Sequence, residues 1–187
     1  MNICVFCASA ENIDSEYFAA AATLGKEIAT RGWNLVYGGT TCGLMREVAE
    51  ATLEEGGKVT GIIPQCIVDR GVAARQISDL IIAGDMKERK CMLRKQADAF
   101  VALPGGWGTL EEITEVITLK QLGLHSKPIV FINTNDYYEY FFLFINNIRK
   151  EGFVSKAYDH VYEVFTTVEE AMEYIENYKV EDLESKY

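Results

Sequence analysis

Histidine is scarce in this sequence, and its scarcity limits the chemistry that the chain can perform. Of 187 residues only His125 and His160 are histidines, and neither stands beside clustered cysteines or carboxylates of metal-ligand spacing. A zinc site or a Ser-His-Asp triad is built from such residues. We therefore expect no metal site, no cofactor and no triad chemistry.

Long hydrophobic runs are also missing. Hydrophobic residues make up 49% of the chain but occur in short segments, whereas a membrane-spanning helix needs about 20 of them in succession. The first residues show no basic leader of the kind that begins a signal peptide. We expect a soluble, cytoplasmic protein that has no membrane partner.

The cysteines are odd in number, which argues against a framework of disulfides. Cys4 and Cys7 have the C-x-x-C spacing of redox pairs, but they fall inside an apolar segment typical of a strand. Redox pairs of that spacing lie at the start of a helix. We expect all five thiols to be reduced: Cys4, Cys7, Cys42, Cys66 and Cys91.

Basic side chains are also fewer than acidic ones. The chain carries 18 basic and 28 acidic side chains, which gives a net charge of -10. Such a charge opposes attraction to a phosphate backbone. Nucleic acid is therefore not an expected partner.

What the sequence does contain is an alternation of strand-like and helix-like segments. This alternation is typical of an α/β fold, and it predicts a doubly wound, Rossmann-like parallel sheet with helices on both faces. Because no repeat or linker interrupts it, we expect residues 1–187 to form a single nucleotide-binding domain. Strands are predicted at 2–8, 33–37, 58–63, 79–83, 99–103, 128–132 and 160–165, and helices at 14–31, 44–55, 85–97, from 110 onward, at 137–151 and after 167. The segment 65–78 shows no clear pattern.

Capping signals support several of these helix ends. Asp14 can cap the first helix, and Gly32 can end it. Thr167 and Glu170 have the spacing of a capping box at the start of the last helix.

Two glycine clusters each follow a predicted strand and precede a helix. They are Gly38-Gly39-Thr40-Thr41-Cys42-Gly43 and Gly105-Gly106-Trp107-Gly108-Thr109. Glycine allows a ligand to approach the backbone, and the N-terminus of a helix favours an anion such as phosphate. Neither cluster has the spacing of a dinucleotide-binding or P-loop motif. Two tight turns without a ligand are the structural alternative.

Between these clusters, residues 87–95 contain five cations. A solvated helix face would explain them, but helical spacing places Arg89 beside Met86, Met92 and Leu93. A partly sheltered guanidinium is well suited to bind phosphate through paired hydrogen bonds, and Lys90 can add a second charge.

Carboxylates follow the second glycine cluster at Glu111, Glu112 and Glu115. They would lie in the first turns of a helix that faces the ligand crevice. The same spacing fits a capping box in which Glu112 returns a hydrogen bond to Thr109. Spacing alone leaves catalysis and capping equally open.

Taken together, these motifs resemble the Lonely Guy (LOG) family of nucleotide phosphoribohydrolases, once labelled lysine decarboxylases. The family hallmark P-G-G-x-G-T-x-x-E runs from Pro104 to Glu112, and its upstream R-K pair is Arg89-Lys90. Further matches include Tyr37-Gly38-Gly39, Gly43-Leu44-Met45 and Gly61-Ile62-Ile63-Pro64.

This resemblance implies hydrolysis of the N-glycosidic bond of a nucleoside 5′-monophosphate, such as a cytokinin riboside 5′-monophosphate or AMP. It implies a catalytic pair, Arg89 and Glu112, and a glycine loop that holds the 5′-phosphate. The substrate-binding residues expected at the matching positions are Ser9, Gly38, Gly39, Thr40, Gly43, Met86, Lys90, Gly105, Gly106, Trp107, Gly108, Thr109, Glu111 and Thr118.

Several positions depart from the family pattern. Thr40, Arg46 and Ala8 stand where glycine is usual, and Lys87 stands where histidine is usual. Thr40 and Arg46 are close to the expected nucleotide site, so the preferred base is not predicted.

Two alternative functions can be weighed against the sequence. A nucleotide-binding carrier would use the same glycine loops without hydrolysis, although the Arg89 and Glu112 pair argues against it. A pyridoxal-phosphate decarboxylase would need a Schiff-base lysine and a partner for the pyridine nitrogen, and no segment supplies them.

The predicted helix at 137–151 is apolar or aromatic on nearly every side. Such a helix needs more than one neighbour to bury it. A second copy of the chain would supply that neighbour, so we expect a homodimer. The alternative is that residues 65–78 or the C-terminal helix cover this helix within one chain.

Overall fold

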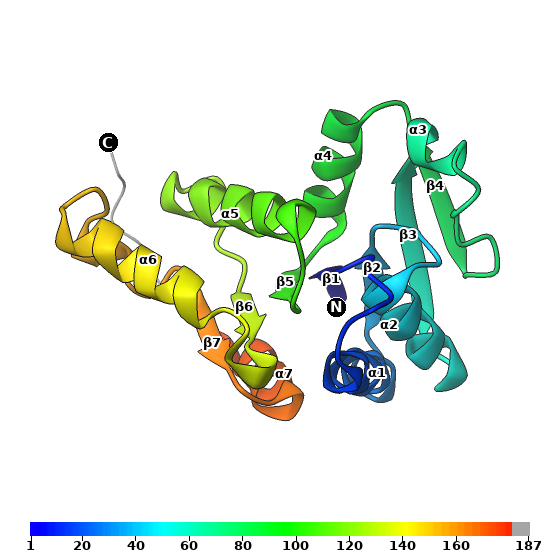
Figure 1. Ribbon diagram of the computed structural model, residues 1–187, viewed down its shortest axis with the longest axis horizontal. Helices are drawn as coiled ribbons and strands as arrows, with labels where there is room; N and C mark the ends of the chain where they lie inside the picture. The colour runs from blue at the N-terminus through cyan, green and yellow to red at the C-terminus, as the bar shows by residue number, and fades with distance from the viewer. Residues whose placement is uncertain (181–187) are drawn as a thin grey trace.

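The computed structural model describes residues 1–180, whose strands form one seven-stranded sheet (Figure 1). Neighbouring strands are parallel and lie in the order β4-β3-β2-β1-β5-β6-β7. The strands are β1 (Asn2–Phe6), β2 (Asn34–Tyr37), β3 (Lys58–Pro64), β4 (Asp79–Ala83), β5 (Ala99–Ala102), β6 (Ile129–Ile132) and β7 (Glu163–Phe165). The predicted parallel sheet is confirmed.

Helices cover both faces of this sheet. One apolar cluster joins the sheet to α1, α2 and α7, and a second cluster joins the opposite face to α4, α5 and α6. The helices are α1 (Ser15–Thr30), α2 (Gly43–Glu54), α3 (Gln65–Val68), α4 (Met86–Gln96), α5 (Trp107–Gln121), α6 (Glu139–Lys150) and α7 (Val168–Asn177). The doubly wound prediction is therefore confirmed.

Strand β1 illustrates why the sheet needs both layers. Ile3 and Val5 point into the cluster with α1 and α2, whereas Cys4 and Phe6 point into the cluster with α4 and α5. Successive side chains of a strand alternate between faces, so a strand that is apolar throughout must be covered on both sides.

The predicted helix caps are present. The Asp14 side chain accepts a hydrogen bond from the Glu16 N–H at 2.9 Å, and Gly32 adopts a left-handed φ of 67° just after α1. The Thr167 hydroxyl accepts from the Glu170 N–H at 3.3 Å. Both helices thus begin where the sequence predicts.

Two predicted boundaries are wrong by three residues. Helix α5 begins at Trp107 rather than near Leu110, because the Leu110 N–H already donates to the Gly106 carbonyl at 3.1 Å. Thr109 therefore lies inside the first turn and cannot be the N-cap, which excludes the capping-box explanation for Glu112. Strand β7 covers only Glu163–Phe165, since the chain is still turning at residues 160–162.

The segment without a clear pattern, residues 65–78, begins with the short helix α3 and then runs back to the loop after β2. The Thr41 N–H donates to the Val72 carbonyl, and the Ala74 N–H donates to the Gly39 carbonyl, each at 2.9 Å. An isolated bridge pairs Thr40 with Ala73. Long-range hydrogen bonds, rather than local propensity, determine the path of this segment.

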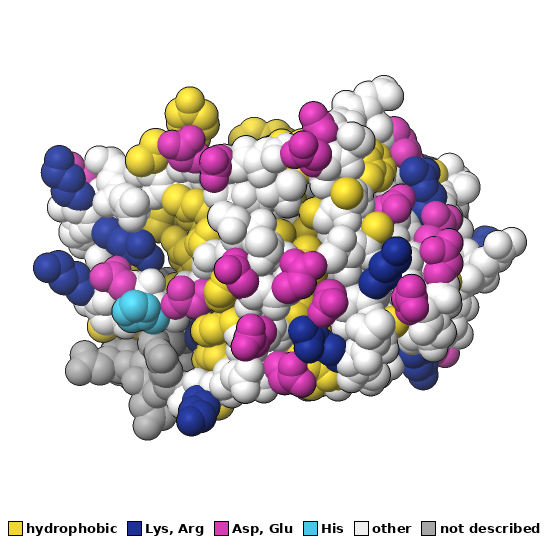
Figure 2. All heavy atoms as spheres, turned by 90° about the horizontal axis from the view of Figure 1, so that it is seen from below, with side chains coloured by type: hydrophobic (Ala, Val, Ile, Leu, Met, Phe, Trp, Pro, Cys, Tyr) yellow, Lys and Arg dark blue, Asp and Glu magenta, His cyan; other side chains and the backbone are white. Residues whose placement is uncertain are grey.

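The surface reflects the acidic composition. On the face seen from below Figure 1, acidic side chains are spread over the centre and basic ones are scattered among them (Figure 2). Within residues 1–180, none of the helices combines the length and the apolar content that crossing a membrane requires.

Candidate active site

The order of the strands reverses between the neighbours β1 and β5: the chain builds the sheet outward from β1 on one side and from β5 on the other. This switch point determines where a ligand crevice forms. The chain leaves β1 toward α1 on one face and leaves β5 toward α5 on the other. The two exits start side by side, since the Ala8 N–H donates to the Pro104 carbonyl at 3.1 Å. Open α/β sheets bind ligands at such a switch point, at the carboxyl ends of the strands.

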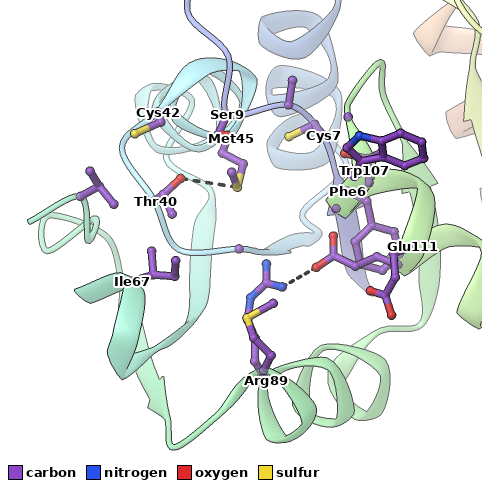
Figure 3. Close-up of a pocket in the computed structure, with 18 of the residues that line it drawn as sticks. Phe6, Cys7, Ser9, Thr40, Cys42, Met45, Ile67, Arg89, Trp107 and Glu111 are labelled. Carbon is purple, nitrogen blue, oxygen red and sulfur yellow. Dashed lines mark hydrogen bonds and ion pairs between the residues drawn. The ribbon is translucent and has the colours of Figure 1, made fainter. Parts of the chain in front are cut away.

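A cavity of about 540 Å³ lies at this switch point, between the loops that follow β1, β2, β3 and β5 and the start of α4 (Figure 3). Eleven of the sixteen predicted site residues line it: Ser9, Gly38, Thr40, Met86, Arg89, Gly106, Trp107, Gly108, Thr109, Glu111 and Glu112. Segments far apart in the sequence therefore meet in one pocket. We call this cavity the crevice.

Arg89 and Glu112 face each other in the crevice from α4 and α5 (Figure 3). Only 9% of Arg89 and 8% of Glu112 are exposed. The Arg89 Nη1 donates to Glu112 Oε1, and its Nε donates to the Ile62 carbonyl at 3.1 Å. The helical spacing predicted a sheltered Arg89, and this prediction is confirmed.

Gly38 makes room for this arginine. A Cβ atom at position 38 would lie 2.7 Å from Arg89 Nη2 and 2.8 Å from the Met45 sulfur. These distances are too short for real atoms, so a larger residue would displace the guanidinium. The residue that follows β2 is therefore glycine because a larger side chain would not fit beside Arg89.

Burial changes the acidity of Glu112. Removal from water raises the pKa of this carboxyl above its ordinary value, and the charge and hydrogen bond of Arg89 oppose the rise without cancelling it. A carboxylate with a raised pKa is a stronger base than an exposed glutamate. The site thus contains a buried carboxylate suited to accept a proton.

A second group of ion pairs lies beside the first. Lys90 contacts Glu111 and lies 3.6 Å from Glu115, and Arg94 lies 2.8 Å from Glu115. These pairs join α4 to α5 along the rim of the crevice. They hold together the two helices that carry Arg89 and Glu112.

The first turn of α5 presents unpaired backbone N–H groups to the crevice. Its N-cap is Gly106, and no side chain caps it. A Cβ at Gly106 or Gly108 would meet nothing within 4 Å, and neither glycine has a positive φ. The protein itself has no steric need for glycine at these two positions, so the open space is available to a ligand. Such a helix start favours an anion.

The start of α2 differs, because a side chain of the protein already fills it. Glu11 accepts a hydrogen bond from the Gly43 N–H at 2.9 Å and pairs with Arg46 through both carboxylate oxygens, at 2.9 and 3.0 Å. The Gly43 hydrogen bond and the Arg46 guanidinium lower the pKa of Glu11. Of the two predicted phosphate loops, the one at α5 remains open to an anion.

Five predicted residues do not line the crevice. Gly39, Gly43 and Gly105 belong to the glycine loops behind its surface, and Lys90 points to Glu111 at the rim. Thr118 is exposed farther along α5, where its hydroxyl donates to the Thr114 carbonyl.

Several residues that line the crevice fall outside the site predicted from the sequence. Ile67, Arg70 and Val72 belong to the segment without a clear pattern, so no local signal could have identified them. Cys7, Cys42 and Met45 lie within two residues of predicted positions along the chain (Figure 3). Burial raises the pKa of Cys7 and of Cys4, so neither thiol forms a reactive thiolate near neutral pH.

Solved structures share this fold. The molybdenum cofactor carrier protein of Chlamydomonas reinhardtii is 24% identical, with a TM-score of 0.71 over 94% of this chain and 95% of that chain. A molybdenum cofactor binding protein of Rippkaea orientalis is 20% identical, with the same TM-score over 94% of both chains. At these identities the likeness concerns the fold.

Sequence relatives are closer. The family model described as "possible lysine decarboxylase" matches residues 45–175. The cytokinin riboside 5′-monophosphate phosphoribohydrolase LOG5 of Arabidopsis thaliana is 41% identical over 177 residues, 95% of this chain and 78% of that protein. A probable enzyme of the same description from Oryza sativa subsp. japonica, LOGL9, is 42% identical over 160 residues, 86% of this chain and 70% of that protein. This chain therefore belongs to the Lonely Guy (LOG) family.

Proposed function

We propose that the protein hydrolyses the N-glycosidic bond of a nucleoside 5′-monophosphate and releases the free base and ribose 5-phosphate. The observation that carries this proposal is the buried Arg89–Glu112 pair beside the open start of α5 in one crevice. The relatives named as cytokinin riboside 5′-monophosphate phosphoribohydrolases support the same reaction class. Their named substrate and AMP are the first nucleotides to test.

The crevice suggests how the nucleotide lies. The 5′-phosphate binds the N–H groups of Gly106, Trp107 and Gly108, where the helix start attracts an anion. The ribose then lies beside Glu112, one turn farther along α5. The base extends toward Ile67, on the side of the crevice opposite Trp107 (Figure 3).

Glu112 acts on the attacking water in this proposal. When the bond from C1′ to the base breaks, its electron pair leaves with the base, and positive charge builds on the ribose. The Glu112 carboxylate stabilises that charge and takes the proton of the water that attacks C1′. The departing base then takes up the proton that Glu112 accepted, directly or through water, so one water is consumed, Glu112 is again a carboxylate, and atoms and charge balance.

Arg89 has two roles. In the empty crevice it keeps Glu112 charged by pairing with it. With substrate bound, its guanidinium steadies negative charge on the departing base or anchors the nucleotide. The hydrogen bond from Arg89 Nε to the Ile62 carbonyl holds the guanidinium in place for either role.

The alternative functions receive less support. A carrier has no need for a buried carboxylate paired with an arginine beside the expected C1′ position. A pyridoxal-phosphate decarboxylase needs a lysine in the pocket, and within residues 1–180 the crevice is lined by none.

Incubation with AMP separates hydrolysis from carriage. We expect free adenine and ribose 5-phosphate in equal amounts, measured by chromatography and by a reducing-sugar assay. AMP that stays intact while bound to the protein would favour a carrier. An absorption band near the visible in the purified protein would favour the decarboxylase.

We also propose that two copies of the chain pair through α6. The side chains of Tyr140, Phe144 and Leu143 are 82%, 61% and 55% exposed, while Phe141 and Phe142 pack inward on Phe131. The two segments that could cover α6 within one chain lie elsewhere. Helix α7 packs on the opposite face of the sheet, and residues 65–78 reach the loop after β2.

Light scattering at micromolar concentration tests the dimer. We expect twice the chain mass of 21.0 kDa, and Phe144→Glu should shift the protein to the mass of one chain. A wild-type mass of one chain would contradict the proposal.

We further propose a single domain and a cytoplasmic location. Residues 1–187 act as one nucleotide-binding domain, which the single sheet supports. A cytoplasmic location agrees with five cysteines that form no disulfide.

A further inference from the structure

The peptide between Gly105 and Gly106 opens the glycine loop of α5, and its own residues do not fix its orientation. Glycine adopts more backbone conformations than other residues, and a Cβ at Gly106 would meet nothing within 4 Å. Within residues 1–180 every peptide bond is trans. In a trans peptide the carbonyl and the following N–H point in opposite directions. The direction of the Gly105 carbonyl therefore decides whether the Gly106 N–H faces the crevice.

The Tyr137 hydroxyl holds this carbonyl. It donates a hydrogen bond to the Gly105 oxygen at 2.7 Å, from the loop that joins β6 to α6. Gly106 lines the crevice, whereas Tyr137 lies outside its lining, so the carbonyl is drawn to the outer side of the glycine loop. The Gly106 N–H is thereby directed to the inner side, where the phosphate binds in the proposed function.

The same hydrogen bond keeps a second N–H available. If α5 began one residue earlier, the Gly105 carbonyl would accept from the Thr109 N–H, four residues on. Within residues 1–180 that bond is absent, and the Leu110 N–H donates to the Gly106 carbonyl at 3.1 Å. Because the Tyr137 hydroxyl occupies the Gly105 carbonyl, the Thr109 N–H stays available to an anion in the crevice.

Tyr137 is itself held by its neighbours. Its ring packs edge-on against the rings of Tyr17 and Tyr138, with centroids 5.8 and 5.0 Å apart. Asn135 and Asp136, just before it, have left-handed φ angles of 55° and 53°, a conformation that persists only where the surrounding structure supports it. Tyr137 is nevertheless 44% exposed. Its hydroxyl therefore contributes more to the glycine loop than to the core.

We propose that Tyr137 is a positioning residue for the phosphate of the substrate, because its hydroxyl orients the Gly105–Gly106 peptide so that the N–H groups at the start of α5 face the anion. This inference rests on the proposed function, in which the phosphate binds there. The neighbouring Tyr138 offers a comparison within the same loop. Its hydroxyl donates an equally short hydrogen bond, at 2.7 Å, to the Leu103 carbonyl, which precedes the glycine loop, and Tyr138 is only 2% exposed. Tyr138 thus stabilises the core.

Tyr137→Phe tests this role because it removes only the hydroxyl. We expect KM for AMP to rise about three- to tenfold, the effect of one hydrogen bond. The value of kcat should change less than about twofold, since the phosphate is bound equally in the ground state and the transition state. For adenosine, which lacks the phosphate, kcat/KM should stay within about twofold of wild type.

Tyr138→Phe is the matched control, since it also removes one hydroxyl and one short hydrogen bond. It should lower the midpoint of urea unfolding, because that bond is buried, and leave KM for AMP within about twofold of wild type. An unchanged KM for AMP in Tyr137→Phe, or an equal loss for AMP and adenosine, would overturn the positioning role.

Binding of ribose 5-phosphate provides a readout that needs no hydrolysis. Tyr137→Phe should raise its Kd about three- to tenfold, whereas Tyr138→Phe should leave it unchanged. If no nucleotide releases its base but this difference persists, the proposed hydrolysis is wrong and the role of Tyr137 stands. If AMP is hydrolysed and the wild type and Tyr137→Phe bind ribose 5-phosphate equally, the hydrolysis stands and the role of Tyr137 is wrong.

Discussion

The two glycine loops look alike in the sequence but differ in the folded protein. Both follow a strand and run into the start of a helix, Gly38–Gly43 into α2 and Gly105–Thr109 into α5. The start of α2 is filled by Glu11, and a Cβ on Gly43 would lie 2.5 Å from the Ala10 carbonyl oxygen. The start of α5 is uncapped, and Gly106 and Gly108 border open space.

The role of a glycine cluster depends on what a side chain would meet at each of its positions. In the α2 loop, glycine is required by the packing of the protein, at Gly43 against the loop after β1 and at Gly38 against Arg89. In the α5 loop, Gly106 and Gly108 leave space that the protein does not use. We infer that the α2 loop shapes the crevice and that the α5 loop binds the anion.

Removal of the carboxylate next to the α5 loop should have the largest effect. Glu112→Gln keeps the size of the side chain but cannot accept a proton, so kcat should fall about 10²- to 10⁴-fold. Base release from a nucleoside monophosphate under saturating conditions measures it. Circular dichroism should report an intact fold, and more than about a tenth of wild-type activity would refute the catalytic role.

Loss of the phosphate from the substrate should have the next largest effect. Adenosine lacks the phosphate that we propose binds the start of α5, so its kcat/KM should be about 10²- to 10³-fold below that of AMP, since charge-assisted hydrogen bonds and the interaction with the helix dipole are both lost. Parallel assays of adenine release measure the ratio. Equal efficiencies would mean that the α5 loop binds some other group.

A methyl group added to each loop should separate their roles. Gly108→Ala occupies ligand space and should lower kcat/KM about tenfold, while stability stays equal or rises by up to about 1 kcal/mol. Gly43→Ala forces a left-handed residue against Ala10 and should cost about 1–3 kcal/mol of stability. Urea unfolding and base-release assays on both variants measure the two effects. Loss of stability in Gly108→Ala together with loss of activity alone in Gly43→Ala would contradict the roles assigned to the two loops.

The smallest effect is expected at the filled helix start. Glu11→Gln removes the negative charge at α2 but leaves the α5 loop untouched, so kcat/KM for AMP should change less than about threefold. The same assay in low and high salt checks it. A loss as large as that of Glu112→Gln would place Glu11 among the groups that act on the substrate.

Much of this arrangement could be predicted from the sequence, and the exceptions have physical causes. The sheet, its two helical layers and the sheltered position of Arg89 follow from periodicity, which depends on neighbouring residues. The sequence predicts too late a start for α5 because Thr109 resembles an N-cap, while glycine is a weak helix former. The position of Arg70 depends on hydrogen bonds between residues more than thirty positions apart, and no local pattern encodes them.

The pairing of β1 with β5 has a further consequence, for the order in which the protein acquires activity as it folds. This pairing joins Ile3 to Ala99, and the Asn2 N–H donates to the Asp98 carboxylate across 96 residues of sequence. Contacts this distant along the chain form slowly, because a long loop must close before they stabilise anything. The crevice lies across this pair of strands, so Arg89 and Glu112 acquire their walls only after that closure. Recovered enzyme activity therefore reports completion of the sheet and should appear later than helical signal during refolding.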